Sequence, residues 1–359
     1  MNDTPQPMAL PDPTTEVRSG LELDVARLTD YLSAAIPGFA GPVAVRQFRG
    51  GQSNPTYLLS TPARSYVLRR KPPGALLASA HAVDREFRVI SALAADGSVP
   101  VPRPFALCTD ATVIGTWFYV MEHVAGRIIW DSCFTEVDRA ARRAHKLALA
   151  ATLAALHRLD PGAVGLGDFG RPDGYLARQI ARWSKQYAED TAAPRVPSME
   201  RLIEWLPRHL PSSEQPAAIV HGDFRVDNVV FAPDGPRVAA VLDWELATLG
   251  DPLADFAYEL MLYRLPTVTV PSLAGRDLDA LGLPSEDEYV AHYCERAGRS
   301  RFDDREFYLA FSMFRLAGIF HGICGRVARG TAVSARARDY AQHLGTIADC
   351  AWRQAQRCG

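Results

Sequence analysis

The segment His221-Gly222-Asp223-Phe224-Arg225-Val226-Asp227-Asn228 decides how this chain of 359 residues is interpreted. Short apolar runs with β propensity flank it at residues 217–220 and 229–231. A third such run, at residues 238–242, ends directly before Asp243-Trp244-Glu245. The polar residues of both segments are therefore expected on short turns between buried strands.

The order of these polar residues matches the kinase pattern H-x-D-x-x-x-x-N, which is followed by an Asp that binds metal. Phosphoryl transfer from ATP needs a carboxylate that orients and deprotonates the acceptor hydroxyl, and oxygen ligands that hold Mg²⁺ against the phosphates. The pattern predicts Asp223 as the catalytic base. It predicts Asn228 and Asp243 as Mg²⁺ ligands and His221 as support for the loop. Each dipeptide alone would indicate an ordinary turn, but together they predict a kinase-type site.

A hairpin that contains glycine precedes this segment, as a kinase-like fold requires. Residues 48–59 are predicted to form strand, turn and strand, with Gly50 and Gly51 where backbone must approach phosphate oxygens closely. Ser53 and Asn54 belong to the same turn. The hairpin lacks the full G-x-G-x-x-G spacing, so by itself it would predict only a turn.

The next strand, at residues 65–71, carries two candidate phosphate-binding cations. Aligned with the kinase sequence Val-Ala-Ile-Lys, Arg69 occupies the usual position of the Lys. Lys71 is expected on the same face because the side chains of alternate strand residues point the same way. Either cation could neutralise phosphate, and a solvated basic strand end is the alternative.

A helix and a hinge are expected after this strand. Residues 81–95 have apolar side chains at helical spacing, and Glu86 lies beside that stripe, where it can pair with the strand cation. An exposed surface Glu is the alternative. Residues 116–121 form a strong strand signal that passes into an extended connector. In a kinase hinge the backbone of this connector recognises adenine, and the candidates here are Met121, the Glu122 carbonyl and the Val124 amide.

With these elements the chain resembles the aminoglycoside phosphotransferase family of kinase-like small-molecule enzymes, from about residue 48 to at least residue 260. The resemblance lies in His-Gly-Asp instead of His-Arg-Asp, and in Asp-Trp-Glu instead of Asp-Phe-Gly. It extends to residues 250–255, where Asp251 is expected to cap a helix and Asp255 to brace the catalytic loop. The resemblance implies an α+β, protein-kinase-like bilobal fold, with a mainly antiparallel-sheet N-lobe and a mostly helical C-lobe.

Residues 66–74, 85–90 and 242–252 are similar to one branch of this family, the kinase-like part of some eukaryotic acyl-CoA dehydrogenase fusions. That resemblance implies a hydroxyacyl-CoA acceptor, phosphorylated on the acyl-chain hydroxyl. Residues 307–359 contain seven Arg, no Lys and two acidic residues, in a chain whose net charge is −2. A basic region suits an anionic acceptor better than a polycationic aminoglycoside. Arginines that face solvent or form internal salt bridges are an equal alternative.

Several acceptors and one different class of function stay open. Choline, homoserine, sugars and aminoglycosides are acceptors that the same fold could phosphorylate. A catalytically silent module that binds nucleotide or a partner protein is the other reading, because Arg69 replaces the usual Lys. A protein kinase is disfavoured because no Ala-Pro-Glu follows Asp243. The acceptor pocket is expected near helices after Asp255, with candidates Tyr258, Arg315, His321 and Arg326.

Length and composition agree with a two-lobed intracellular enzyme. We expect a flexible tail at residues 1–20, an N-lobe at 21–122 and a C-lobe at 123–359, because single cores stop growing near ~250–300 residues. Scattered cysteines, near-neutral charge and the lack of a signal-like or spanning segment predict a cytoplasmic protein that binds neither nucleic acid nor membrane. Oligomeric state is not predicted. Helices are expected at residues 139–159, 173–188, 199–209, 286–298, 303–328 and 332–356.

Overall fold

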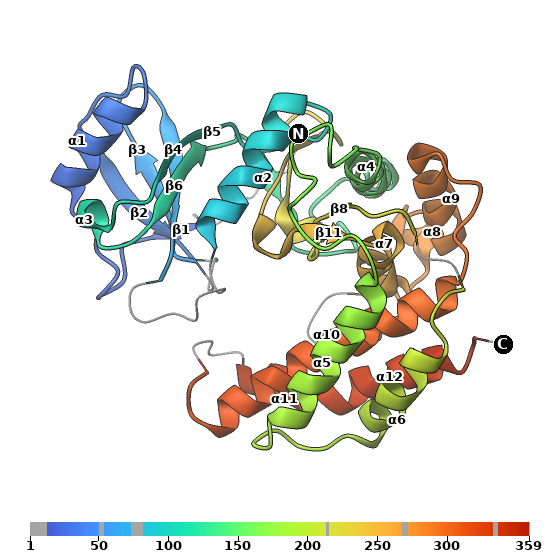
Figure 1. The fold of residues 1–359 in the computed structure, drawn as a ribbon. Helices are drawn as coiled ribbons and strands as arrows, with labels where there is room; N and C mark the ends of the chain where they lie inside the picture. The colour runs from blue at the N-terminus through green and yellow to red at the C-terminus, as the bar shows by residue number, and fades with distance from the viewer. Residues whose placement is uncertain are drawn as a thin grey trace, which may run out of the picture. The chain divides into compact units, whose positions relative to one another are not determined.

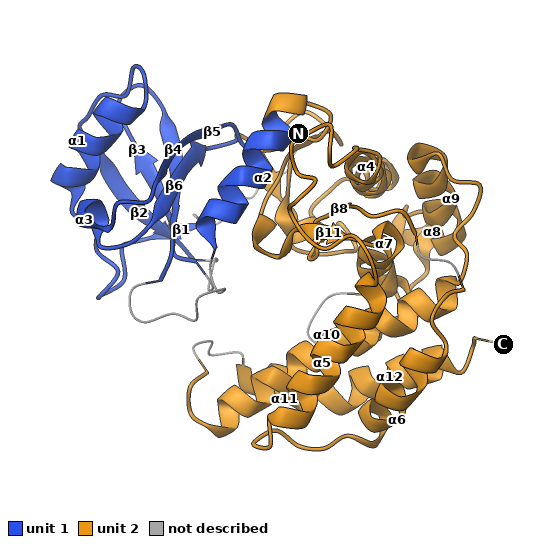
Figure 2. Ribbon diagram, viewed as in Figure 1, with its two compact units in different colours: residues 1–94, 102–124 blue, residues 95–101, 125–359 orange. Residues whose placement is uncertain are grey.

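The computed structural model describes residues 13–49, 54–72, 82–212, 215–267, 272–332 and 337–358. The chain forms two compact units, shown in different colours in Figure 2. Unit 1 contains residues 1–94 and 102–124, and unit 2 contains residues 95–101 and 125–359. Unit 1 is built on an antiparallel sheet and unit 2 is mostly helical (Figure 1). The predicted α+β, kinase-like fold class is confirmed.

Unit 1 contains a six-stranded antiparallel sheet with the order β1-β2-β3-β4-β6-β5. Its described elements are β1 (Thr14–Thr15), α1 (Val25–Ala35), β2 (Ala44–Phe48), β3 (Thr56–Ser60), β4 (Ser65–Arg70), α2 (Val83–Asp96), β5 (Pro104–Cys108), α3 (Ala111–Ile114) and β6 (Phe118–Glu122). The last two residues of α2 belong to unit 2. Strand β1 lies within the predicted tail at residues 1–20, where it pairs with β2, so the sheet begins earlier in the chain than we expected.

Strand β4 shows how this sheet positions charged side chains. Tyr66 and Leu68 belong to a buried cluster with Leu28 and Leu32 of α1. Because successive strand residues point to opposite faces, Arg69 projects from the other face of the sheet. Burying the apolar side chains of one face therefore fixes the direction of Arg69.

Unit 2 combines short strands with helices. Strands β10, β9 and β7 form one antiparallel sheet, and β11 pairs with β8 in another. The strands are β7 (Arg127–Ile128), β8 (Ala218–Val220), β9 (Val229–Phe231), β10 (Val238–Val241) and β11 (Thr248–Gly250). The α-helices are α4 (Arg139–His157), α5 (Tyr175–Glu189), α6 (Pro197–Trp205), α7 (Pro252–Leu260), α8 (Leu278–Leu281), α9 (Glu286–Ala297), α10 (Arg305–Ala328), α11 (Ala337–Gln342) and α12 (Leu344–Ala355). The 3₁₀ turns are η1 (Leu206–Arg208), η2 (Val226–Asn228), η3 (Trp244–Leu246) and η4 (Met261–Tyr263).

Helix α7 begins where its sequence predicts. The Asp251 carboxylate accepts hydrogen bonds from the amides of Leu253 and Ala254, and Pro252 occupies the first helical position. Tyr308 of α10 donates to the other carboxylate oxygen of Asp251, at 2.8 Å. The cap thus also joins α7 to α10.

Helix α10 is the central helix of unit 2. By length and composition it could cross a membrane, but 89% of its most apolar 18-residue window is buried inside the fold. Helix α12 packs along it, and α5 and α11 also contact it (Figure 1). Residues 332–356, which we expected to be helical throughout, contain the two helices α11 and α12.

Candidate active site

The catalytic loop candidate follows β8 and turns at a glycine. Gly222 has φ +84°, and a Cβ there would lie 2.7 Å from the Leu246 carbonyl oxygen. A side chain would therefore meet both backbone strain and a backbone clash. This explains in physical terms why the loop carries Gly between His221 and Asp223.

His221 is fully buried and holds the loop from inside. Its Nδ1 accepts a hydrogen bond from the Asp223 amide at 3.2 Å, and its Nε2 lies 2.8 Å from the Leu242 carbonyl oxygen. Because Nδ1 is an acceptor, the proton belongs on Nε2, which donates to Leu242. His221 thereby connects the residue before Asp243 to the amide of Asp223.

Asp255 of α7 lies beneath the same loop. Its carboxylate accepts hydrogen bonds from the amides of His221, at 2.7 Å, and Gly222, at 2.9 Å. His157 of α4 contacts it at 3.2 Å and is itself bound by the Tyr293 hydroxyl at 2.7 Å. Burial raises the pKa of Asp255, but His157, His221 and the Gly222 amide outweigh burial and lower that pKa below its ordinary value. An ionised carboxylate is therefore available to hold two loop amides.

The predicted base Asp223 contacts the predicted metal ligand Asn228, and the amide of Leu242, the residue before Asp243, donates to the Asn228 carbonyl oxygen at 2.8 Å. The Asn228 side-chain amide donates to the Asp223 carbonyl oxygen at 2.9 Å and to its carboxylate at 3.3 Å. Both bonds use Nδ2, and no described residue donates to the Asn228 Oδ1. Asp243 follows β10 with φ 63° and ψ 63°, in the left-handed region, where non-glycine residues are strained by about 1 kcal/mol or more. Such strain is characteristic of functional turns.

Arg225 is a charged residue of this loop that our sequence interpretation did not assign. Its Nη2 lies 2.9 Å from the Asp227 carboxylate, and its Nε lies 3.7 Å from that of Asp223. Burial lowers the pKa of Arg225, but Asp223, Asp227 and Asp243 outweigh burial and raise it. Burial raises the pKa of Asp227, and the negative charges of Asp223 and Asp243 raise it further. Arg225 lowers this pKa but does not outweigh them. An Arg between two Asp residues within one motif was the signal that could have identified it.

Unit 1 holds a second buried charge cluster. Arg69 Nε lies 2.9 Å from Oε2 of Glu86, whose side chain is 1% exposed. Asn54 donates to Glu86 Oε1 at 2.8 Å, and the Tyr119 hydroxyl donates to Oε2 at 3.0 Å. Lys71 instead lies 3.7 Å from Asp84 and over the Trp117 ring at 4.3 Å. Of the two candidate cations, Arg69 is therefore the one that pairs with Glu86, and Lys71 pairs with Asp84 in the first turn of the same helix.

The remaining nucleotide-site predictions concern backbone. Gly50, Gly51 and Ser53 lie outside the described residues. Met121 is buried and Glu122 is exposed at the end of β6, where the Glu122 amide donates to the Arg103 carbonyl oxygen. No described residue accepts a hydrogen bond from the Val124 amide.

The four acceptor-pocket candidates separate into two pairs. Arg315 of α10 donates to the Gly222 carbonyl oxygen, and its guanidinium lies 4.6 Å from the centre of the Tyr258 ring. His321 is buried against the Tyr187 ring, with the ring centroids 4.3 Å apart. Arg326 is exposed near the end of α10, eleven residues or about 16 Å of helix beyond Arg315. The structure thus brings Tyr258 and Arg315, but not His321 and Arg326, to the Asp223 loop.

The donor atoms of this site suit a hard cation. Carboxylate and amide oxygens are the ligands that Mg²⁺ prefers, and Mg²⁺ commonly takes its other ligands from water and phosphates. Among the described residues, no group of three or more His, Cys, Asp or Glu side chains could hold a metal. The side-chain oxygens of Asn228 and Asp243 are donors of the kind that fits Mg²⁺.

Comparison with known proteins identifies relatives over most of the chain. Residues 44–297 match the model of the Phosphotransferase enzyme family. Acyl-CoA dehydrogenase family member 10 of Mus musculus is 43% identical over 359 residues, a match that covers 98% of this chain and 33% of the mouse protein. The chain thus spans about a third of the length of that relative.

Solved structures share the fold. A proposed aminoglycoside phosphotransferase from Ralstonia eutropha has a TM-score of 0.85 and 45% identity, over 94% of this chain and 99% of that one. An aminoglycoside phosphotransferase in complex with ADP and hygromycin B has a TM-score of 0.61 and 16% identity, over 92% and 99% of the two chains. The second likeness is one of fold alone.

Proposed function

The chain belongs to the phosphotransferase enzyme family, and we propose that it is a Mg²⁺-dependent kinase that phosphorylates a hydroxyl of a small molecule, with a hydroxyacyl-CoA as acceptor. Membership confirms the family resemblance recognised in the sequence, including the likeness to acyl-CoA dehydrogenase family members. A kinase-type phosphotransferase agrees with the family and with the related fold that binds ADP. The observation that carries the proposal is the cluster of Asp223, Arg225 and Asn228 on one braced loop.

In the proposed reaction the acceptor hydroxyl oxygen attacks the γ-phosphorus of ATP. A new phosphorus–oxygen bond forms, and the bond from the γ-phosphorus to the oxygen that bridges it to the β-phosphate breaks, which releases ADP. Asp223 orients the hydroxyl and accepts its proton. The hydrogen bonds from Asn228 to Asp223 hold the base in place for this task.

Positive charge on the loop is needed because negative charge spreads over the phosphoryl oxygens during transfer. Arg225 supplies it beside Asp223, at 3.7 Å from its carboxylate. In unit 1 we assign nucleotide-phosphate contact to Arg69, because Glu86 orients its guanidinium in the way that the helix Glu orients the kinase Lys. Asn54 donates to the other oxygen of Glu86, and Tyr119 donates to the same oxygen that faces Arg69. This intact pair argues against a silent module.

Asn228 Oδ1 and the Asp243 carboxylate are the atoms that would hold Mg²⁺. When bound, the ion would neutralise charge on the β- and γ-phosphates. The protein contributes the fixed position of both ligands: Asn228 is tied to Asp223, and Asp243 follows a strand whose end is tied to His221.

The choice of hydroxyacyl-CoA rests on the relatives rather than on a pocket. The match to an acyl-CoA dehydrogenase family member supports an acceptor linked to CoA. The basic carboxy-terminal region supports a CoA-linked acceptor less strongly than its excess of Arg suggests. Arg315 is buried against the catalytic loop and Arg329 pairs with Asp190, so neither is free for an anionic acceptor.

A direct assay tests the proposal. ATP-dependent phosphoryl transfer is measured across hydroxyacyl-CoAs with the hydroxyl at different carbons, free hydroxy acids, choline, homoserine, sugars and aminoglycosides. Each reaction is repeated with excess EDTA and with Asp223→Asn. We expect transfer to hydroxyacyl-CoA that EDTA and the substitution both abolish. Transfer to another acceptor would replace the substrate assignment, and no transfer to any acceptor would contradict the proposed kinase.

A further inference from the structure

Five backbone polar groups of residues 221–223 are held by side chains, some from the loop itself and some from the helices of unit 2. The amides of His221 and Gly222 bind the Asp255 carboxylate, and the amide of Asp223 binds the His221 ring. The carbonyl oxygen of Asp223 accepts from Asn228. The carbonyl oxygen of Gly222 completes the set by accepting from Arg315. The path of the loop is thus specified by side chains, because it has no regular ladder to specify it.

The Gly222 residue lies between opposite charges. Asp255 of α7 accepts from its N–H, and Arg315 of α10 donates to its C=O. Hydrogen bonds that involve an ionised group are shorter and stronger than neutral ones. The C=O that Arg315 holds belongs to the peptide that carries the Asp223 amide, so its orientation sets where the Asp223 side chain starts.

Arg315 is built into the protein for this contact. It is 7% exposed on a helix, and the Tyr258 ring lies under its guanidinium at 4.6 Å. Stacking on an aromatic ring and a fixed fork of donors are properties of Arg that Lys does not share. Tyr258 in turn lies near Asp223. Burial and the negative charge of Asp223 raise the pKa of Tyr258 to about 12, so its hydroxyl keeps its proton.

We propose that Arg315 is a positioning residue for Asp223, which it orients by holding the Gly222 carbonyl and the Tyr258 ring from α10. This inference rests on the proposed function and replaces the expectation that Arg315 and Tyr258 line the acceptor pocket. Through this contact α10 helps to position the catalytic base. Helices α12, α11 and α5 pack on α10, and Arg315 is a direct contact from α10 to the catalytic loop.

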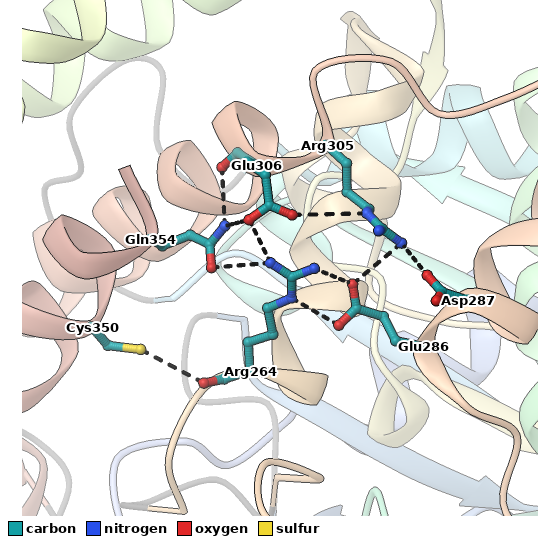
Figure 3. Close-up of polar contacts among 7 residues, drawn as sticks. All are labelled: Arg264, Glu286, Asp287, Arg305, Glu306, Cys350 and Gln354. Atoms are coloured by element: carbon teal, nitrogen blue, oxygen red, sulfur yellow. Dashed lines mark hydrogen bonds and ion pairs between the residues drawn. The ribbon is translucent and has the colours of Figure 1, made fainter. Parts of the chain in front are cut away.

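A matched control is available in the same unit. Arg264, directly after η4, binds Glu286 with two hydrogen bonds at 2.8 and 2.7 Å and Glu306 with one at 2.6 Å (Figure 3). Its side chain is 16% exposed. Arg264→Met therefore removes a partly buried guanidinium that makes several hydrogen bonds but does not contact the catalytic loop.

The first measurement does not depend on catalysis. Amide hydrogen exchange of peptides that cover residues 218–228 is compared in the wild type, Arg315→Met and Arg264→Met at equal distance below each melting temperature. We expect faster exchange of these loop amides in Arg315→Met, by about tenfold, and wild-type exchange in Arg264→Met. Equal loop exchange in Arg315→Met and Arg264→Met would overturn the inference, even if no acceptor had been found.

The second measurement separates positioning from stability. With the acceptor that the panel identifies, Arg315→Met should lower kcat on the order of 100-fold, the cost of a displaced catalytic group. The KM for ATP should stay within about twofold, because ground-state binding is retained. The kcat of Arg315→Lys should lie between those of the wild type and Arg315→Met, since Lys can donate to the Gly222 carbonyl but cannot stack as a planar fork. Arg264→Met should lower the melting temperature without a change in kcat at a temperature where it is folded.

Chemical rescue gives the decisive contrast. In Arg315→Ala, added guanidinium at low millimolar concentration should raise kcat in a saturable way, while equal urea or NaCl should not. A residue with a merely structural role would not respond, and no rescue together with wild-type kcat in Arg315→Met would overturn the assignment.

The Asp223→Asn control distinguishes failure of the proposed function from failure of the Arg315 role. If Asp223→Asn keeps full activity, the proposed mechanism fails; if only Asp223→Asn loses activity, the Arg315 role fails.

Discussion

Two arginines of unit 2, the buried Arg315 and the partly buried Arg264, link the region of α7 to α10 through different kinds of partner. Arg264 follows α7 and joins it directly to α10 through Glu306, with Glu286 of α9 as a second partner (Figure 3). Arg315 belongs to α10; it stacks on Tyr258 of α7, and it reaches Asp255 only through the interposed Gly222 residue. One guanidinium is neutralised by carboxylates, and the other holds a neutral carbonyl next to the candidate base.

The comparison shows that one charged contact can stabilise the fold while another fixes the position of a catalytic residue. A buried pair that is broken leaves an uncompensated charge, so its loss is expressed as lost folding free energy. A guanidinium on a carbonyl holds a neutral group, so its loss leaves no unpaired charge but removes one of the two side-chain contacts that orient the Gly222–Asp223 peptide, the other being His221. Variants that affect one property and spare the other can therefore test this distinction.

The largest effect is expected from the base itself. Asp223→Asn keeps the size of the side chain but removes the proton acceptor, so kcat should fall by about 10²- to 10⁴-fold. The melting temperature and Mg·ATP affinity should be close to those of the wild type, as measured by calorimetry. A loss of folding stability as well as activity in this variant would show that Asp223 stabilises the fold, as the Arg264 cluster does.

Gly222→Ala should damage both geometry and stability. A Cβ at φ +84° would lie 2.7 Å from the Leu246 carbonyl oxygen. We expect a loss of about 3 kcal/mol in the free energy of unfolding, from strain plus clash. Gly330→Ala is the control: it has φ +71° but nothing within 4 Å of the added Cβ, and should cost only about 1 kcal/mol.

Urea unfolding of the two glycine variants separates the contributions. If Gly222→Ala and Gly330→Ala cost the same free energy, backbone conformation alone accounts for the glycine in the loop. The close approach of the Leu246 carbonyl would then have no energetic consequence.

Arg264→Met should lower the free energy of unfolding by about 2 kcal/mol at neutral pH, because Glu286 and Glu306 lose their shortest ionic contacts and keep only the longer ones to Arg305. Burial raises the pKa of Glu306, but hydrogen bonds from Arg264 and Gln354 outweigh burial and lower it below its ordinary value of 4.5. A carboxylate with a lowered folded pKa contributes stability above its unfolded pKa and loses that contribution as pH falls. The difference between wild type and Arg264→Met should therefore shrink below about pH 4.5.

Chemical unfolding at a series of pH values from 7 to 3 checks this sign. Asp255 contributes the same kind of acid sensitivity in both proteins, because its pKa is also lowered. Only the difference in free energy of unfolding between wild type and Arg264→Met reports on the Arg264 cluster. A difference that grows on acidification would contradict the assignment of Glu306 as an ionised partner.

Local sequence patterns predicted the fold class and the order of the site residues. Strand runs around Asp223 and Asp243 and the helical stripe around Glu86 depend on neighbours within a few residues, which periodicity can detect. The roles assigned to those residues stay predictions. What the sequence could not predict are contacts such as His157 with Asp255 and Arg315 with Gly222, which join residues 98 and 93 positions apart. Such pairs depend on how helices pack, and no spacing rule encodes them.

The candidates His321 and Arg326 illustrate the same limit. Both lie on α10 like Arg315, so position in the chain gave no reason to separate them. Helical rotation and packing do: His321 is buried against Tyr187 and Arg326 is exposed to solvent. A helix of 24 residues passes through several environments, and only the three-dimensional packing shows which of its residues reach a loop.

The smallest effect is expected in unit 1, where the same comparison can be made between Arg69 of β4 and Lys71, which directly follows that strand. Arg69 pairs with Glu86, and the two side chains are 8% and 1% exposed; Lys71 pairs with Asp84, with exposures of 22% and 43%. An ion pair in contact with solvent contributes little, so Lys71→Ala should change the free energy of unfolding by less than about 1 kcal/mol.

If Arg69 is the cation that contacts the phosphates, Lys71→Ala should also leave the KM for ATP within about twofold, because it removes no ground-state contact to ATP. Arg69→Met should raise that KM on the order of tenfold, since a charge-assisted contact to phosphate is lost. Titration of Mg·ATP binding to both variants distinguishes the cations without any acceptor. A larger loss of affinity in Lys71→Ala would assign the phosphate contact to Lys71 and leave the Arg69–Glu86 pair, like the Arg264 cluster, a source of stability alone.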